Sequence, residues 1–390
     1  MTTIVMPPGG FMSVCIIGTG LIGGSIAAAL QEHPAPTLVY GVDVDAGSLE
    51  HALEHELVAE AALVDDASER GWFGPGGVDL IIVATPAQFA EGWLERIGAE
   101  GFDGVVTDVA STKGGIVKTA RRALKPPARF VGGHPMAGSE RSGIQAARPD
   151  LFANAYWLLT PSADTDMDAY RRVHEFVSAL GARVISVDPR SHDEAVAIVS
   201  HVPHVAAAAL VDVAAAHAGE GKELLRLAAG GFKDTTRIAA GSADLWTGIC
   251  LDNADALAAG LRELRGVLGE FEAMVRAGDG EEIRRWLATA ADVRRSLPQQ
   301  WVPATTTLRE LKVPILDRPG VVAEITGAVS AAGCNIEGID IDHVSEDTAV
   351  LVLVLTDEGD VTVLVRELTE LGYEPRLETL DEAAAEEAGE

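Results

Sequence analysis

The chain has 390 residues, of which 47% are hydrophobic and 23% are charged, a globular composition that excludes disorder over most of its length. At roughly 150 residues per domain, this length predicts two or three domains. The 59 acidic and 30 basic side chains give a net charge of -29, which argues against binding to nucleic acid or to an anionic membrane. A site for an anionic ligand must therefore draw local positive charge from a helix N-terminus or from a few Arg and Lys side chains.

Cysteine usage and the N-terminus argue against secretion. Cys15, Cys250 and Cys334 lie far apart without paired spacing, so we expect neither a disulfide framework nor a thiolate zinc site. The first ten residues lack the charged and apolar regions of a signal peptide. The most apolar stretch, residues 195–219, is interrupted by histidines, a proline and an aspartate, and this predicts a buried helix rather than a membrane span. We expect a cytoplasmic protein.

The first half of the chain alternates β-rich runs with helical patterns, which is typical of a parallel sheet with crossover helices. The predicted helices lie near residues 21–31, 46–56, 87–98, 114–123 and 165–180. The predicted strands lie at residues 13–17, 37–42, 78–84, 104–109, 128–133, 156–160 and 182–187. We expect this α/β domain to cover residues 11–187.

The amino-acid composition of the second half changes twice along the chain. Residues 188–296 are rich in Ala and Leu and predict an all-helical domain, whose apolar segment LVDVAAA indicates that it forms a homodimer. A Pro- and Thr-rich linker follows. Residues 308–380 then show the order β-α-β-β-α-β, which predicts a ferredoxin-like domain, and the acidic tail is expected to fray.

A glycine-rich turn follows the first predicted strand and opens a predicted helix. In such a G-x-G-x-x-G turn, the first glycine permits the tight bend, the second lets a pyrophosphate approach the backbone, and the third allows helix and strand to pack closely. The helix N-terminus supplies N–H groups for the phosphates. This predicts a Rossmann-type domain in which the dinucleotide contacts Gly18, Gly20, Leu21, Ile22 and Gly23.

Further residues at the ends of predicted strands indicate which dinucleotide binds. Asp43 ends the second strand, where a carboxylate accepts hydrogen bonds from a ribose diol and repels a 2′-phosphate; Asp45 adds to this repulsion. Thr85 and Pro86 follow the third clear strand, at the sheet edge where such folds bind ligands. NAD is therefore expected in preference to NADP.

Oxidation of an alcohol by a nicotinamide enzyme needs a group that takes the hydroxyl proton, and histidine suits this near neutral pH. His134, in the motif GGHPMAGSE, follows a predicted strand and is expected beside the nicotinamide. Ser111 and Lys113 follow the preceding strand at the same edge; alternatively, Ser111 or Thr112 caps the helix that starts near Lys113. Other histidines lie in polar or helical surface contexts and are set aside: His33, His51, His55, His174, His217 and His343.

Two further motifs lie in the helical half. His201 and His204, in SHVPH, share a helix face, and they either contact an anionic substrate or are buried in helix packing. No acidic or cysteine residue stands at a spacing that would complete a metal site with them, so no metal is expected. Arg237 ends the motif GGFKDTTR, and its guanidinium fork suits a substrate carboxylate; the alternative is a structural ion pair with Asp234.

In this order, the segments GTGLIGGS, TDVASTKG, VGGHPMAGSE, VSHVPH and GGFKDTTRIA resemble the prephenate dehydrogenase family, which includes the arogenate dehydrogenases, over residues 13–295. The resemblance implies that His134 is the catalytic base, that Ser111 hydrogen-bonds the same substrate hydroxyl, and that Arg237 binds the ring carboxylate. It also places four residues at the substrate pocket: His201, His204, Glu140 and Asp234.

The implied reaction is NAD-dependent oxidative decarboxylation of prephenate to 4-hydroxyphenylpyruvate, a step of tyrosine biosynthesis. The motifs do not separate prephenate from arogenate as the substrate. A non-catalytic sensor of nucleotides and amino acids is a different possibility, but such a protein has no need of a base at the hydride position.

Residues 309–380 resemble an ACT module, a small regulatory fold that binds amino acids. The segment DRPG, which ends at Gly320, fits its first βα turn, and GCNI, which contains Asn335, fits the start of its second strand. The resemblance implies that L-tyrosine, as the end product, binds near Gly320 and Asn335 and inhibits. The alternative is that the module only strengthens dimerisation.

Overall fold

The computed structural model describes residues 6–124, 129–138, 141, 143–217, 228–296, 309–316, 318, 320–343, 348–355 and 359–379. Glu140 and two of the four residues of the predicted DRPG turn, Asp317 and Pro319, lie outside these residues. The chain divides into two compact units. One comprises Met1–Asp193, Ala240–Asp252 and Thr307–Glu390, and the other comprises Glu194–Ala239 and Asn253–Thr306.

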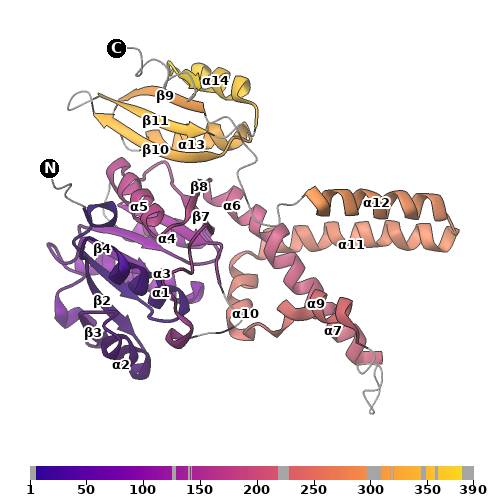
Figure 1. The fold of residues 1–390 in the computed structure, drawn as a ribbon, viewed down its shortest axis with the longest axis horizontal. Coiled ribbons are helices and arrows are strands. Elements are labelled where there is room, and N and C mark those ends of the chain that lie inside the picture. Colours follow the sequence, from indigo (N-terminus) through magenta and orange to yellow (C-terminus); the bar gives the residue numbers. More distant parts are fainter. Residues whose placement is uncertain are drawn as a thin grey trace. The chain divides into compact units, whose positions relative to one another are not determined.

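An eight-stranded sheet organises the first unit (Figure 1). Its strand order is β3-β2-β1-β4-β5-β6-β7-β8, and the first six strands in this order are parallel. The strands are β1 (Ser13–Ile17), β2 (Leu38–Asp43), β3 (Glu60–Leu63), β4 (Leu80–Val83), β5 (Val105–Asp108), β6 (Phe130–Pro135), β7 (Tyr156–Thr160) and β8 (Arg183–Ser186). The order reverses beside β1, which is the switch point where sheets of this type bind nucleotides.

The strands are apolar on both faces because helices cover both faces. Val14 and Ile16 of β1 pack into one cluster with α1 and α5, whereas Cys15 and Ile17 pack into another with α3 and α4. The helices of this domain are α1 (Leu21–Glu32), α2 (Ala46–Glu54), α3 (Ala87–Glu100), α4 (Gly114–Ala123) and α5 (Met167–Ala179). The predicted Rossmann-type architecture is confirmed.

Two features of this sheet differ from the prediction. The short strand β3 was not expected, because its sequence EAAL carries little β signal. Strands β7 and β8 run against the others, since β7 pairs antiparallel with β6. The described part of the β6–β7 connection contains a single turn of 3₁₀-helix, Ile144–Ala146, rather than the crossover helix that a parallel strand needs.

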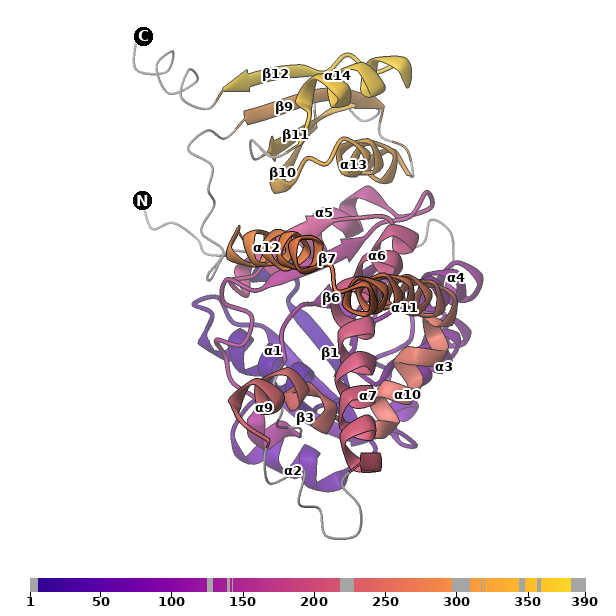
Figure 2. The same ribbon diagram turned by 90° about the vertical axis from the view of Figure 1, so that its right-hand side faces the viewer.

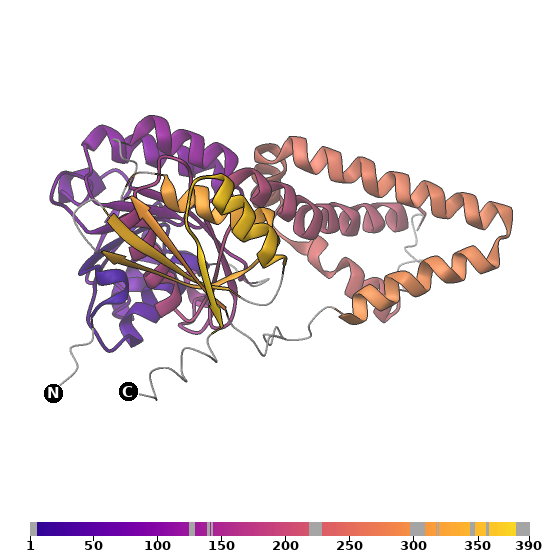
Figure 3. The ribbon, with the colours of Figure 1, turned by 90° about the horizontal axis from the view of Figure 1, so that it is seen from above.

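The second half is helical up to the linker, as predicted. Its helices are α6 (Pro189–Val196), α7 (Val202–His217), α9 (Gly230–Thr236), α10 (Ala243–Asp252), α11 (Ala254–Ala277) and α12 (Gly280–Ser296). Helices α11 and α12 form a hairpin (Figure 3), which turns at the left-handed Gly278 and is held near the turn by Phe271 and Trp286, with ring centroids 4.9 Å apart. Gly260 of α11 has no side chain, so this helix packs closely on Ile198 and Val202.

The stretch predicted to be a buried helix is largely exposed in the single chain. Residues Pro189–His217 are helical throughout, with a π-helical turn at Ala197–His201, but the buried residues of α7 are confined to its first turns. Leu210 and Val213 are 46% and 59% exposed. This helix is also long and apolar enough to cross a membrane by length and composition alone, a test that core helices of soluble proteins pass as well.

A four-stranded antiparallel sheet, in the order β10-β11-β9-β12, forms the C-terminal module (Figure 2). Alternate residues of β9 and β11, such as Leu311, Val313 and Leu353, are buried in one cluster with helices α13 and α14. The elements are β9 (Arg309–Leu316), α13 (Val321–Ala331), β10 (Ile336–His343), β11 (Thr348–Leu355), α14 (Val361–Glu370) and β12 (Arg376–Thr379). This is the predicted βαββαβ fold.

Candidate active site

The glycine turn after β1 has the backbone that a dinucleotide site needs. Gly18 has a φ of +98°, and a Cβ there would collide with the carbonyl of Ala84. A Cβ on Gly23 would collide with the carbonyl oxygen of Gly18, so this glycine sets how closely α1 packs on the strand. A Cβ on Gly20 would meet nothing within 4 Å, and Gly20 caps α1 without a side-chain hydrogen bond. The start of α1 thus leaves space and N–H groups that fit a pyrophosphate.

Asp43, at the end of β2, is anchored beside this turn. One of its carboxylate oxygens accepts hydrogen bonds from Thr19 N (2.7 Å) and Thr19 Oγ1 (3.0 Å), and the other accepts one from Asp45 N (3.0 Å). Asp45 has a separate structural task, because its carboxylate caps α2 through Ser48 and Gly47, and these hydrogen bonds lower its pKa. Asp43 is therefore the carboxylate held at the turn.

Thr85 and Pro86 follow β4 at the same edge of the sheet. Pro86 is the N-cap of α3. Thr85 Oγ1 is buried and has no hydrogen-bond partner within the described part of the chain. A buried hydroxyl without a partner is costly unless a ligand supplies one, so this position also fits a bound dinucleotide.

A buried ion pair fixes the backbone that carries His134. Lys113 is fully buried; its ammonium contacts the Asp108 carboxylate and donates a hydrogen bond to Gly133 O at 2.7 Å. Asp108 in turn accepts a hydrogen bond from Gly133 N at 3.1 Å. Burial lowers the pKa of Lys113, and the Asp108 carboxylate opposes that shift. Lys113 was expected at the ligand edge with Ser111, but its ammonium points into the protein and clamps the residue before His134.

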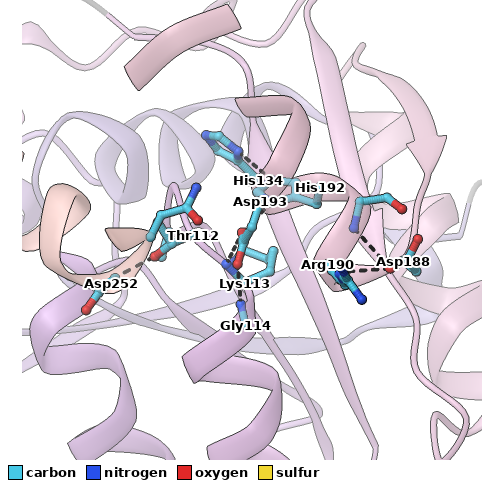
Figure 4. A network of polar contacts seen from close by, with 12 residues as sticks. Thr112, Lys113, Gly114, His134, Asp188, Arg190, His192, Asp193 and Asp252 are labelled. Carbon is cyan, nitrogen blue, oxygen red and sulfur yellow. Dashed lines mark hydrogen bonds and ion pairs between the residues drawn. The ribbon is translucent and has the colours of Figure 1, made fainter. Parts of the chain in front are cut away.

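His134 lies near the carboxyl end of β6 and is 9% exposed. Its Nδ1 lies 2.9 Å from Nε2 of His192, and Nδ1 of His192 lies 2.8 Å from Oδ1 of Asp193 (Figure 4). The Asp193 carboxylate also accepts hydrogen bonds from the backbone N–H groups of Lys113 and Gly114, both at 2.8 Å. His134 is thus the first of three side chains in a row.

Asp193 also settles which residue caps α4. The backbone N–H groups at the start of this helix donate to Asp193, and the N-cap residue, Lys113, makes no side-chain capping hydrogen bond. The alternative that Ser111 or Thr112 caps the helix is therefore wrong. Thr112 Oγ1 instead lies 3.5 Å from a carboxylate oxygen of Asp252, and Ser111 is half-buried beside it.

Sequence reasoning missed His192 and Asp193. The only signal was a His-Asp pair one turn into the helix after the last strand of the sheet, and nothing in the sequence links that pair to His134, 58 residues earlier. The assignment of His174 to the surface was wrong. This residue of α5 is 6% exposed, and burial lowers its pKa to about 4. The side chain of His343 lies outside the described residues.

The remaining predicted residues belong to the second compact unit. His201 and His204 are both buried; Nδ1 of His201 lies 3.4 Å from the side-chain nitrogen of Asn253, and burial lowers the pKa of His204. Arg237 and Asp234 are exposed at the end of α9, and no ion pair between them occurs in residues 228–296. The alternative of a structural Asp234–Arg237 pair is therefore wrong.

Comparisons with known proteins agree with this arrangement. Residues 26–186 match the family model of the prephenate dehydrogenase nucleotide-binding domain, and residues 188–289 match that of the prephenate dehydrogenase dimerization domain. Residues 311–373 match the ACT domain. A prephenate dehydrogenase of Bacillus subtilis is 34% identical over 341 residues, which cover 86% of this chain and 89% of that protein.

Solved structures give the same result. The crystal structure of Aquifex aeolicus prephenate dehydrogenase in complex with hydroxyphenyl propionate and NAD+ has a TM-score of 0.70 and 27% identity, and the match covers 76% of this chain and all of that one. Synechocystis arogenate dehydrogenase has a TM-score of 0.63 and 31% identity, covering 74% of this chain and 100% of the other.

Proposed function

The chain belongs to the prephenate dehydrogenase family, and we propose that His134, at the carboxyl end of β6, is the base of its reaction. The enzyme converts prephenate to 4-hydroxyphenylpyruvate and carbon dioxide with NAD as the oxidant. The observation that carries the assignment of the base is the position of His134. It is a nearly buried imidazole on the strand two places along the sheet from β4, at the same edge as the glycine turn.

The chemistry balances with these residues. When bound, NAD would supply the oxidant, as acceptor of the hydride on the ring carbon that carries the hydroxyl group. His134 takes the hydroxyl proton as this hydride leaves, and Ser111 hydrogen-bonds the same oxygen. The bond from the ring to its carboxylate then breaks, its electron pair makes the ring aromatic, and the proton returns from His134 to the phenolate oxygen. From the family resemblance, Arg237 is the proposed ligand of the ring carboxylate, and four further residues are the proposed substrate-binding residues: His201, His204, Glu140 and Asp234.

The test of this assignment is turnover by His134→Asn. We expect kcat to fall by about 10²–10⁴, because this is what removal of a general base typically costs, while affinity for NAD stays unchanged. NADH formation at 340 nm measures both the parent and the variant, with prephenate and arogenate in parallel reactions. Turnover close to that of the parent would refute the role of His134, and a preference for arogenate would change the substrate without changing the base.

We also propose which residues hold the cofactor. The fingerprint residues Gly18, Gly20, Leu21, Ile22 and Gly23 hold the pyrophosphate, Asp43 binds the ribose diol, and Thr85 and Pro86 line the edge. The open space at Gly20, the anchored carboxylate of Asp43 and the unpartnered hydroxyl of Thr85 support this assignment.

The localisation, the oligomeric state and the domain limits are also part of the proposed function. We propose a cytoplasmic homodimer with domain limits at residues 11–187, 188–296 and 308–380. The match of residues 188–289 to a dimerization domain and the exposed apolar face of α7 support the dimer.

L-Tyrosine is the proposed effector of the ACT domain, bound near Gly320 and Asn335. Gly320 is the left-handed N-cap of α13, and a Cβ there would collide with the carbonyl oxygen of Ala163. Gly320 N also approaches Thr165 O at 3.4 Å, so the turn contacts the segment that leads into α5. A ligand at this turn would therefore act on the nucleotide-binding domain directly.

Tyrosine titration of the parent and of Asn335→Ala tests the effector site, with phenylalanine as the ligand control. We expect the variant to lose sensitivity to tyrosine and to keep its uninhibited kcat. Equal inhibition of both proteins, competitive with prephenate, would show that tyrosine acts at the active site and that the ACT domain only strengthens the dimer.

A further inference from the structure

One ring nitrogen of His134 faces another histidine of the protein. Its Nδ1 faces Nε2 of His192, at 2.9 Å. Nε2 of His134 is therefore the nitrogen that must receive the substrate proton. A neutral imidazole carries one hydrogen, so Nε2 can act as a base only when that hydrogen sits on Nδ1.

The position of the hydrogen on His134 can be derived from Asp193, the last of the three side chains in the row. The Asp193 carboxylate accepts hydrogen bonds from two backbone N–H groups, in addition to the one from His192. Burial alone would raise the pKa of Asp193, but the hydrogen bonds from His192, Lys113 and Gly114 outweigh burial and lower it. Asp193 is therefore ionised and can only accept. Nδ1 of His192 must then carry a hydrogen.

His192 stays neutral, so its other nitrogen is an acceptor. Burial is the largest influence on its pKa and lowers it; the ammonium of Lys113 acts in the same direction, whereas the carboxylates of Asp193 and Asp108 oppose it. With its hydrogen on Nδ1, a neutral His192 offers the lone pair of Nε2 to His134. The hydrogen of His134 is thereby drawn to Nδ1.

We infer that His192 and Asp193 are positioning residues that hold His134 in the tautomer in which Nδ1 carries the hydrogen and Nε2 can accept a proton. The inference rests on the proposed role of His134 as the base. The row runs from Asp193 Oδ1 to His192 Nδ1–H, and from His192 Nε2 to His134 Nδ1–H (Figure 4). When His134 takes the substrate proton, the same row stabilises the imidazolium, because its Nδ1–H already has an acceptor that is polarised by a carboxylate.

Several contacts hold the residues of this row in place. The side chain of His192 is fully buried. The carboxylate of Asp193 is tied to the first residues of α4, and the strand residue before His134 is tied to the Asp108–Lys113 pair. Turning the His134 ring over about its Cβ–Cγ bond would place the carbon Cδ2, rather than Nδ1, against His192 and break the row.

Two variants of His192 separate positioning from packing. His192→Leu removes the acceptor for His134 Nδ1–H, whereas the amide oxygen of His192→Gln can replace it. We expect His192→Leu to lower kcat by about 10- to 100-fold, as loss of a hydrogen bond to a charged group does. We expect KM for prephenate and for NAD to change little, and His192→Gln to recover most of kcat.

The pH profile and ring ¹⁵N NMR give readouts that a packing defect would not move. Without its acceptor, the imidazolium of His134 is less stable, so the acidic limb of the kcat/KM profile should move to lower pH in His192→Leu. The ¹⁵N shifts of His134 should show the Nδ1-protonated tautomer in the parent and a mixture in the variant. His174→Leu is the matched control, since it removes another buried, neutral imidazole, and it should change neither readout.

The outcomes are distinct. Parent-like kcat and pH profile in His192→Leu, or an Nε2-protonated His134 in the parent, would overturn the inference and leave the proposed function intact. Parent-like turnover in His134→Asn would instead overturn the role of His134 on which the inference rests. If His192→Leu does not fold, the tautomer in the parent and the activity of His192→Gln still decide the question.

Discussion

The sheet edge of the first unit and helix α7 of the second unit differ in how their side chains are covered. Around His134, the polar row consists of the buried side chains of His134 and His192 and the partly buried side chain of Asp193. On α7, by contrast, apolar residues such as Leu210 and Val213 are exposed. Polar side chains of the first unit thus find partners in neighbouring strands and helices, whereas apolar side chains of the second unit are left exposed.

The physical basis of the difference lies in the two kinds of element. Parallel strands bring residues from distant parts of the sequence to one edge, where His134, Asp43 and Thr85 lie at the ends of three strands of one sheet. Helix α7 packs against α11 through its first turns. The rest of the helix therefore keeps its apolar side chains exposed. Three substitutions test the roles assigned to these two regions.

The largest effect is expected from a charge on the exposed face of α7. Val213→Asp would place a carboxylate in the proposed dimer interface, and because an unpaired buried charge costs several kcal/mol, the dimer Kd should rise by about 100-fold or more. Sedimentation equilibrium measures this change. Leu53→Asp, at an exposed position of α2, is the control and should leave the assembly intact. An unchanged dimer in Val213→Asp would place the interface elsewhere.

The second variant tests the exposed cation of the helical unit. Arg237→Ala should raise KM for prephenate by about 10- to 100-fold, because a charge-assisted hydrogen bond to a carboxylate is lost, while KM for NAD stays constant. Lys233→Ala removes another exposed cation of the same segment and serves as the control. A normal KM with a lowered Tm would instead assign Arg237 a structural role.

The smallest effect concerns the cofactor. Asp43→Asn should raise the use of NADP relative to NAD by about tenfold, since it removes the charge that repels a 2′-phosphate. Asp45→Asn makes the same change of charge two residues away, at the cap of α2, and should shift the ratio much less. Equal shifts in the two variants would mean that general charge, rather than the ribose contact, sets the preference.

Much of the fold could be read from local patterns. Apolar runs such as LIIV of β4 predict strands of a parallel sheet, and the order of elements after the linker predicts a ferredoxin-like module; both were confirmed. The direction of β7 was not readable, because it depends on a connection that lacks a crossover helix. The exposure of α7 was also misjudged, since apolar composition does not show whether the covering surface belongs to the same chain.

Local sequence patterns predict the glycine turn, the order of the domains, and the place of His134 near the carboxyl end of a strand, because each depends on neighbouring residues. The contacts of His134 and of the strand that carries it depend instead on residues that are distant in the sequence. Lys113 is turned inward to Asp108, and His192 and Asp193 reach His134 and α4 from 58 and 80 residues away in the chain. These contacts arise because burial forces each polar group to find a partner, and the partner is the group that folding brings near, whatever its distance in sequence.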